Sequence, residues 1–247
     1  MKISVITIAY QAEEYITRTI KSILKQESDD YELEYIIIDG ASTDRTISIA
    51  ESYRKEMEQK GIEYRIISEK DQGIYDAMNK GIRLACGDII GILNSGDTYE
   101  PCALSEVTKV FADGDCELMF ANVRIIRKDG STVVKKARVR RFQTSRDWNH
   151  PTTFVRSALY KENPFPMLGV HDDYAFYLKM YKQRRKIVTI PVLLANFYLG
   201  GASNERNWKA IKQRIRDRYR YCYRINGYSR WYLFECIFIE MIKMILA

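Results

Sequence analysis

Short runs rich in β-branched residues alternate with helical patterns through the first hundred residues of this 247-residue chain. The runs have the composition of strands buried on both faces of a sheet, and they occupy residues 3–9, 35–39, 64–68 and 89–93. The segments between them repeat apolar residues at helical spacing, and they occupy residues 16–24, 45–59 and 74–85. Strands separated by helices predict βαβ units, and hence an α/β fold with a mostly parallel central sheet flanked by helices.

The pattern changes after residue 100, where predicted strands follow one another more closely. The segment Lys-Asp-Gly-Ser at residues 128–131 predicts a hairpin turn, so we expect an antiparallel second half. The predicted helices of this half occupy residues 101–111, 157–161 and 173–182, and its predicted strands occupy residues 117–126, 132–139, 187–190 and 194–198. Two further helices, at about residues 206–223 and 231–247, predict a C-terminal helical tail.

The net charge of +7 is concentrated in two blocks of the sequence. Residues 124–146 contain nine Lys or Arg, and residues 206–224 contain eight. Such blocks favour an anionic partner, namely phosphate, nucleic acid or acidic lipid, although each could equally be a solvated basic face.

The cysteines and the N-terminus indicate where the protein resides. Its five cysteines form an odd set without Cys-x-x-Cys spacing, which indicates reduced thiols. The first residues have a strand pattern and lack the apolar region and cleavage site of a secretory signal. No apolar run reaches the roughly 18–20 residues needed to span a bilayer. We therefore expect a cytoplasmic protein.

Acidic residues recur at or just beyond the ends of predicted strands. In open α/β sheets ligands bind outside the carboxyl ends of the strands. One aspartate at such a place is commonly a helix N-cap, but several around one cleft would repel a phosphorylated ligand unless a cation neutralised them. The set therefore suggests a metal–diphosphate site. Its members are Asp39, Asp71, Asp97 and the pair Asp172-Asp173.

Taken in order, these segments resemble family-2 glycosyltransferases of the GT-A fold, of the bacterial surface-polysaccharide type. Those enzymes transfer a sugar from a nucleotide-diphosphate donor. Each segment is weak evidence alone, and the ordered set is specific and covers residues 1 to about 205. The segments are Thr7-Ile8-Ala9-Tyr10, residues 38–44 with Asp39, Asp71 to Gly81, Leu93-Asn94-Ser95-Gly96-Asp97, His150 with its Thr-Phe-Val strand, Asp172 to Leu178, and Gly200-Gly201-Ala202-Ser203.

The resemblance implies a donor site at the carboxyl ends of the first strands. The nucleoside would contact the end of the first strand, where the ring of Tyr10 could stack on a base. Asp39, an ionised acceptor, would accept hydrogen bonds from uracil or ribose. The full donor set that the resemblance implies is Thr7, Ala9, Tyr10, Asp39, Asp71, Asn79 and Ser95.

The resemblance also implies the roles of the metal, the base and the acceptor side. Asp97 would hold Mg²⁺ or Mn²⁺, which stabilises the charge developing on the leaving diphosphate. Asp173, with Asp172 as the alternative, would take the proton of the acceptor hydroxyl, and direct displacement would invert the anomeric centre. His150 would lie on the acceptor side, or else fill a polar position in the core.

Three positions depart from the pattern of the family. Asp39 is followed by Gly40 where many members have a second aspartate. The segment from Asn94 to Asp97 lacks the first acid of the Asp-x-Asp motif, which should weaken metal affinity. His150 is followed by Pro151 and not by Gln.

The C-terminal tail has a distinct composition, because it combines cationic, aromatic and apolar residues. Residues 231–247 are apolar at 14 of 17 positions, and the charged residues Glu235, Glu240 and Lys243 fall within one helical arc of about 140°. A basic helix followed by an amphipathic one is typical of proteins that lie on an anionic leaflet. The alternative is that the last helix packs on the sheet or on a twin subunit in a homodimer.

We therefore expect a GT-A domain over residues 1–205, with a nucleotide-binding half at 1–100 and an acceptor-side half at 101–205, followed by the tail at 206–247. The expected function is inverting transfer of a sugar, with UDP as the expected carrier and TDP or GDP as alternatives. The acceptor would be a saccharide or a lipid-linked saccharide in surface polysaccharide synthesis, which would place the protein on the inner face of the cell membrane.

Three other interpretations compete. A sugar-phosphate nucleotidyltransferase would carry a glycine-rich basic loop after the first strand, where this chain has residues 10–14 without glycine or cation. A non-enzymatic, basic nucleic-acid-binding protein would leave the acidic strand ends unexplained, so no nucleic-acid partner is expected. A degenerate transferase would keep the fold while Asp97 or Asp173 fails to align. The pattern leaves open the sugar, the linkage and the oligomeric state.

Overall fold

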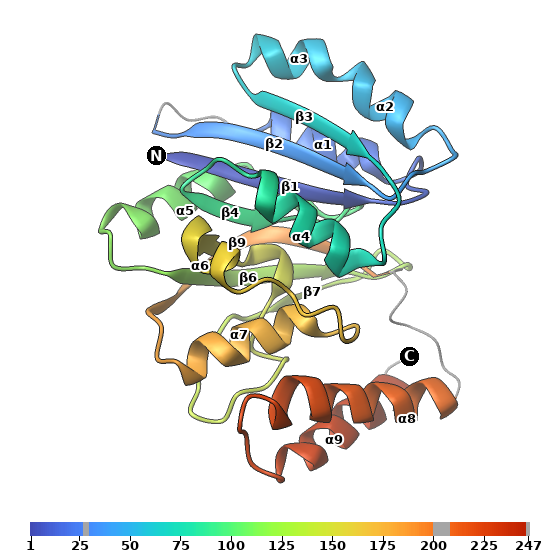
Figure 1. Cartoon of the computed structure of the whole chain (residues 1–247), viewed down its shortest axis with the longest axis vertical. Coiled ribbons are helices and arrows are strands. Elements are labelled where there is room, and N and C mark those ends of the chain that lie inside the picture. The colour runs from blue at the N-terminus through green and yellow to red at the C-terminus, as the bar shows by residue number, and fades with distance from the viewer. Residues whose placement is uncertain (27–29, 200–207, 246–247) are drawn as a thin grey trace.

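The computed structural model describes residues 1–26, 30–199 and 208–245. Its strands form a sheet through the middle of the molecule, with helices on both faces (Figure 1). The strands are β1 (Lys2–Ala9), β2 (Glu32–Asp39), β3 (Glu63–Ser68), β4 (Ile89–Ile92), β5 (Thr98–Tyr99), β6 (Leu118–Ile126), β7 (Thr132–Lys135), β8 (Phe154–Arg156) and β9 (Ile187–Tyr198). They run in the order β3-β2-β1-β4-β8-β6-β9-β5, with β7 beside β6.

The helices follow the order that the sequence predicts. In Figure 1, α2 and α3 lie at one end of the long axis, whereas α8 and α9 lie at the other end. The helices are α1 (Ile16–Leu24), α2 (Thr46–Ser52), α3 (Arg54–Gln59), α4 (Ile74–Leu84), α5 (Ala103–Ala112), the 3₁₀ turn η1 (His150–Thr152), α6 (Ser157–Glu162), α7 (Asp172–Lys182), α8 (Trp208–Asp217), the π-helix η3 (Arg218–Arg224) and α9 (Tyr232–Ile245).

The first half contains the parallel block that the alternation predicts. Strands β3, β2, β1 and β4 pair in parallel, and Ala9 lies opposite Asp39, which lies opposite Ser68. Alternate residues of β1 serve the two faces, since Val5 packs with the core that includes α1 and Ile6 packs with the core that includes α4. Burial on both faces explains why these strands are continuously apolar.

The second half differs from the antiparallel expectation in one pair. Strand β8 is antiparallel to β4 and to β6, but β6 and β9 are parallel. The two short strands expected at 187–190 and 194–198 are one strand, because a register shift next to Asn122 lets it pass the exposed Pro191 without losing its pairing. The single helix expected at 45–59 is two helices that meet at Tyr53.

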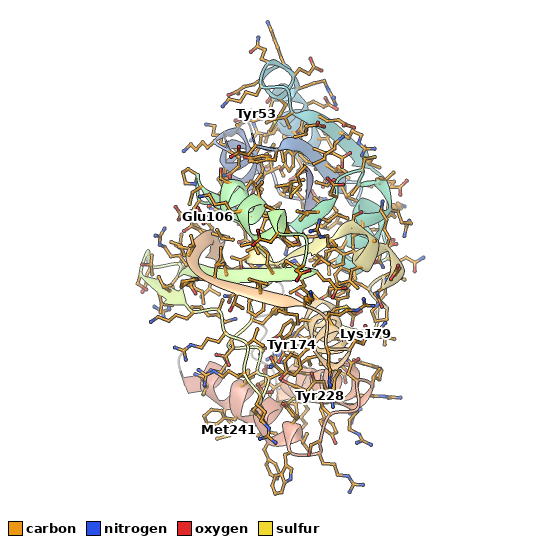
Figure 2. The ribbon with its side chains drawn as sticks, turned by 90° about the vertical axis from the view of Figure 1, so that its left-hand side faces the viewer. Tyr53, Glu106, Tyr174, Lys179, Tyr228 and Met241 are labelled. Carbon is orange, nitrogen blue, oxygen red and sulfur yellow. The ribbon has the colours of Figure 1, made fainter. Side chains whose placement is uncertain are left out.

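The tail packs beneath α7. Tyr174 of α7 contacts Tyr223 of η3 edge-on, and the hydroxyl of Tyr228 donates to the carbonyl of Leu178 at 3.1 Å. Figure 2 shows Tyr174 and Tyr228 in the lower part of the molecule, where the tail meets α7. Within the described residues, no helix is both long and apolar enough to cross a membrane. The expected loop at 200–203 lies outside the described residues.

Candidate active site

The carboxyl ends of β1, β2 and β3 hold Asp39 in a fixed position. Its carboxylate accepts hydrogen bonds from the N–H of Ser42 at 2.9 Å, the hydroxyl of Ser42 at 2.5 Å and the hydroxyl of Ser68 at 2.6 Å. Thr7 and Ala9 are buried beside it, and the Thr7 hydroxyl accepts from the hydroxyl of Tyr35. The loop after β2 and the end of β3 therefore orient the acceptor that the resemblance assigns to the nucleoside.

Tyr10, Gly40 and Asp71 converge at one corner of this edge. The side chain of Tyr10 is 66% exposed. A Cβ added at Gly40 would lie 2.6 Å from Asp71 Oδ2 and 3.2 Å from Tyr10 Cδ2. The carboxylate of Asp71, from the loop after β3, thus occupies the space that a side chain at position 40 would need. An acid therefore stands at this corner although the second acid of the family pattern is absent.

Helix α4 joins the two halves of the chain. The side-chain amide of Asn79 donates to the carbonyl of Phe165 and accepts from its N–H, both at 2.9 Å. One turn earlier, the hydroxyl of Tyr75 donates to Asp173 Oδ1 at 2.9 Å. Asn79 is thus fully engaged with the loop before α7. The sequence analysis missed Tyr75, although its spacing of four from Asn79 places both on one helix face.

Asp97 lies in the loop after β4 and is 5% exposed. Its Oδ1 accepts a hydrogen bond from the N–H of Tyr198 at 3.0 Å. Burial raises the pKa of Asp97 to about 7, although this N–H and the charge of Arg18 oppose the shift. A cation bound at Asp97 would have to displace a proton near neutral pH.

Arg18, which the sequence analysis missed, brings a positive charge to the same loop. Its Nε donates to the carbonyl of Gly96 at 2.6 Å, and its guanidinium lies 4.1 Å from the ring centroid of Tyr198. Ser95 belongs to this loop as well, and its N–H donates to the carbonyl of Ile8 at 3.1 Å. The only signal in the sequence was a basic residue in the first turn of α1.

The loop also offers oxygen atoms that suit a hard divalent cation. The side-chain oxygen of Asn94 is buried, and no described residue donates a hydrogen bond to it. Asn94 and Asp97 belong to one tight turn, since the N–H of Asp97 donates to the carbonyl of Asn94. The described residues contain no group of three or more acidic, histidine or cysteine ligands. Mg²⁺ is commonly held by one or two protein groups together with water and substrate phosphates, so this set fits.

Asp173, at the start of α7, accepts two hydrogen bonds and lies against a histidine. Its Oδ1 accepts from the hydroxyl of Tyr75 at 2.9 Å and from the N–H of Tyr174 at 2.8 Å. Its Oδ2 lies 3.2 Å from His150 Nδ1, and 18% of its side chain is exposed. A carboxylate has about four lone-pair positions, so these donors orient it and leave room for one more.

His150 has a buried environment beside this carboxylate. Burial lowers the pKa of His150, although the charge of Asp173 opposes the shift. Of the two tautomers of the neutral imidazole, the one with the proton on Nδ1 suits the contact with Asp173. Nearby, the ammonium of Lys135 donates to the carbonyl of Trp148 at 2.6 Å, and burial lowers the pKa of Lys135 to about 8.

Asp172 has a different environment from its neighbour. It is 1% exposed, and its Oδ2 accepts from the N–H of Leu168 at 2.7 Å. Burial raises the pKa of Asp172, and the N–H of Leu168 is the largest opposing influence. Asp172 thus holds the turn that leads into α7.

The sequence profile of the family described as "Glycosyl transferase family 2" matches residues 4–184. The chain belongs to glycosyltransferase family 2. This membership favours an enzyme of glycosyl transfer over the nucleotidyltransferase and the nucleic-acid-binding protein.

Two curated relatives show how similar the chain is to named members. It is 27% identical over 218 residues to the teichuronic acid biosynthesis glycosyltransferase TuaG of Bacillus subtilis, covering 85% of this chain and 84% of TuaG. It is 26% identical over 199 residues to the poly(ribitol-phosphate) beta-N-acetylglucosaminyltransferase TarS of Staphylococcus aureus, covering 76% of this chain and 34% of TarS. The chain thus spans most of one relative and a third of the other.

Solved structures share the fold at low identity. The crystal structure of TarS residues 1–349 matches with a TM-score of 0.65 and 22% identity over 89% of this chain and 66% of that one. The mannosyltransferase PcManGT of Pyrobaculum calidifontis, in complex with GDP-Man and Mn²⁺, matches with a TM-score of 0.62 and 18% identity over 89% of this chain and 61% of that one. The predicted GT-A-like α/β fold, with a mixed, mostly parallel sheet and C-terminal helices, is confirmed.

Proposed function

We propose that this protein transfers a sugar, with inversion at the anomeric carbon, from a nucleoside-diphosphate donor to a hydroxyl of a saccharide or lipid-linked saccharide. The observation that carries the proposal is the carboxylate of Asp173, which two hydrogen bonds and the contact with His150 orient and which keeps an accepting position. That position is what a base needs to receive the proton of an attacking hydroxyl.

The donor would bind along the carboxyl ends of β1, β2 and β4. Asp39 is an acceptor held in place by two serines, which suits an N–H of uracil or a ribose hydroxyl. The exposed ring of Tyr10 offers a stacking surface beside Asp71. We propose UDP as the carrier, in line with the complex of TarS with UDP-GlcNAc. The complex of PcManGT with GDP-Man keeps GDP as the alternative to test.

The diphosphate would lie at the loop after β4. Asp97 and the side-chain oxygen of Asn94 would hold Mg²⁺ or Mn²⁺, which supplies charge stabilisation to the leaving diphosphate. Structural relatives of the fold are seen with Mn²⁺. Arg18 would add a fixed positive charge next to this loop, because its guanidinium is anchored on the carbonyl of Gly96.

The acceptor would approach Asp173. An alcohol hydroxyl has a pKa far above 7, so its attack needs a carboxylate to take the proton as the new bond forms. Asp173 has the free accepting position for this, whereas Asp172 is buried and engaged with the backbone of Leu168. His150 and Tyr75 would act as positioning residues, since Tyr75 donates to the carboxylate and His150 lies 3.2 Å from it.

We place the reaction in the synthesis of a cell-surface polysaccharide, at the inner face of the membrane. Support comes from the similarity to TuaG, named for teichuronic acid biosynthesis, and to TarS, named for poly(ribitol-phosphate).

Nucleotide binding tests the proposal first. UDP, GDP and TDP are titrated with and without Mn²⁺, and a screen for donor hydrolysis with UDP-sugars follows. We expect UDP to bind, and to bind more tightly with Mn²⁺ in the wild type and in the control Asp113→Ala, which alters an exposed aspartate far from the loop after β4. If no nucleotide binds under either condition, the proposed function is wrong.

A further inference from the structure

The last helix of the structure exposes large apolar side chains and turns its two glutamates toward the protein. Large apolar side chains from residue 231 to residue 241 are between 36% and 71% exposed. They are Trp231, Leu233, Phe234, Ile237, Phe238 and Met241. At 100° per residue they cover one side of α9, and Figure 1 shows this helix at the end of the molecule remote from β3. A contiguous apolar surface of this kind marks a site of interaction.

The two glutamates of the helix, Glu235 and Glu240, are held by contacts within the protein. Glu240 is 2% exposed and lies 2.8 Å from the guanidinium of Arg214. Glu235 accepts hydrogen bonds from the hydroxyls of Tyr223 and Thr144, both at 2.9 Å. These contacts fix the rotation of α9, so the apolar side cannot turn inward without breaking them.

The rest of the tail exposes positive charge. Four cations at four-residue spacing along α8 and η3 are exposed, and a fifth precedes Trp231. They are Lys212, Arg216, Arg220, Arg224 and Arg230. Apart from Glu235 and Glu240, the acidic residue between residues 208 and 242 is Asp217. Its carboxylate accepts a hydrogen bond from the side-chain amide of Gln213. The exposed side chains whose placement is described in this segment therefore include apolar and cationic groups but no carboxylate.

We propose that this tail is a docking surface for an anionic lipid bilayer. The apolar side of α9 enters the boundary between head groups and acyl chains, and the exposed cations contact the acidic head groups. Charge complementarity selects this occupant. A second copy of the chain would bring two sets of the same five cations together, whereas an anionic leaflet neutralises them.

Docking would also orient the candidate active site. Arg218 Nη2 lies 3.1 Å from His171 Nε2, and the thiol of Cys222 donates to the carbonyl of His171 at 3.4 Å. His171 directly precedes the start of α7, so the tail is attached to the element that carries Asp173. This step rests on the proposed function, because it identifies the acceptor as a lipid-linked saccharide presented at the bilayer surface.

Vesicle flotation of the full chain tests the proposal. The wild type should bind vesicles of phosphatidylcholine with phosphatidylglycerol, should not bind phosphatidylcholine alone, and should dissociate as salt is raised. Phe234→Glu/Phe238→Glu should lower the affinity at least tenfold. The control Val133→Glu/Val134→Glu changes another exposed apolar pair, on β7, and should bind as the wild type does. Arg216→Glu/Arg220→Glu should lower the affinity about fivefold per residue or more.

Tryptophan fluorescence gives a second readout. Trp208→Phe leaves two tryptophans, of which Trp231 is exposed and Trp148 is buried. A change in emission when vesicles are added therefore reports on Trp231. Vesicles with phosphatidylglycerol should shift the emission to shorter wavelength, and brominated lipids should quench it.

Two outcomes would overturn the proposal. One is equal flotation with and without phosphatidylglycerol, or flotation that survives Phe234→Glu/Phe238→Glu. The other is a dimer in light scattering that this variant converts to a monomer while vesicles never bind, which would show that a second copy covers α9. Binding of UDP with Mn²⁺ is measured without vesicles and should be unchanged in the variant. If the wild type does not bind UDP with Mn²⁺, the proposed function is wrong, whereas the docking proposal is unaffected.

Discussion

The nucleoside end of the donor site differs from the surroundings of Asp173, because its carboxylate is held mainly by a neighbouring loop, whereas Asp173 is held by segments far apart in the sequence. Asp39 ends β2 and is held mainly by Ser42, three residues later. Asp173 instead receives a hydrogen bond from Tyr75, 98 residues earlier, and contacts His150. The nucleoside end of the donor site is thus built mainly by the carboxyl ends of parallel strands, and the acceptor side is built by tertiary packing.

This difference has a consequence for substitutions. Loss of a side chain that is held mainly by local contacts, such as that of Asp39, should disturb few other residues, so it should affect ligand binding most. A residue in the cluster around Asp173 is held by its partners, so the loss of any donor should affect turnover more than donor affinity.

The largest effect should come from the base. Asp173→Asn keeps the size of the side chain but removes the acceptor for the hydroxyl proton, so turnover should fall about 10²–10⁴-fold with nucleotide affinity retained. Turnover is measured at saturating donor, and nucleotide binding by calorimetry. Asp172→Asn is the matched variant, and it should keep most of the turnover. If instead Asp173→Asn remains active and Asp172→Asn does not, the base is Asp172.

The next largest effect should come from the metal-binding loop. Asp97→Ala should abolish the increase in UDP affinity that Mn²⁺ causes, and it should leave the metal-free affinity nearly unchanged. Because the pKa of Asp97 is about 7, protons compete with the metal, and the effect of Mn²⁺ in the wild type should grow as pH rises through 7. A Mn²⁺ effect that survives Asp97→Ala would place the metal elsewhere.

The same carboxyl predicts how stability depends on pH in metal-free protein. Its pKa is about 7 in the folded state and near the ordinary 3.8 when unfolded, so the folded protein holds this proton more tightly. Stability should therefore decrease as pH rises from about 4 to 7, by about 4 kcal/mol from this group. Asp97→Asn should remove that slope in urea unfolding. An identical slope in the variant would show that Asp97 is not buried as described.

The sequence predicted the parts of the site that local pattern determines. Apolar runs identified β1 to β4, and the aspartates at their ends lie where the sheet places ligands. It did not predict Arg18 or Tyr75, because their partners lie 78 and 98 residues away and no local pattern records such a contact. The contacts of Asn79 were equally unpredictable, since the nitrogen and the oxygen of its side-chain amide both form hydrogen bonds with the backbone of Phe165.

The tail shows a second limit of sequence patterns. The arc that contains Glu235 and Glu240 was correctly predicted, but periodicity identifies two faces without saying which one turns inward. Here the charged face is inside, because Arg214 lies against Glu240 while Tyr223 donates to Glu235. The orientation of α9 depends on its contacts with η3 and α8, and the residue pattern of α9 alone cannot predict where those two elements lie.

A smaller effect should come from the donors that orient Asp173. Tyr75→Phe removes one hydroxyl whose partner is a carboxylate, which should lower turnover about tenfold and leave UDP affinity unchanged. The control Tyr160→Phe alters another fully buried tyrosine and should stay near wild-type turnover. Equal losses in both variants would point to packing and not to the hydrogen bond.

The smallest effect should come from the corner at Gly40. In Gly40→Ala the new Cβ would meet Asp71 Oδ2 at 2.6 Å, so the carboxylate must move away from the ring of Tyr10. UDP affinity should fall a few-fold, while Gly169→Ala, whose Cβ meets nothing closer than 3.8 Å, should bind UDP as the wild type does. The double variant Gly40→Ala/Asp71→Ala should bind no more weakly than Asp71→Ala alone, because the clash is then absent. Additive losses would mean that Gly40 acts on the donor directly and not through Asp71.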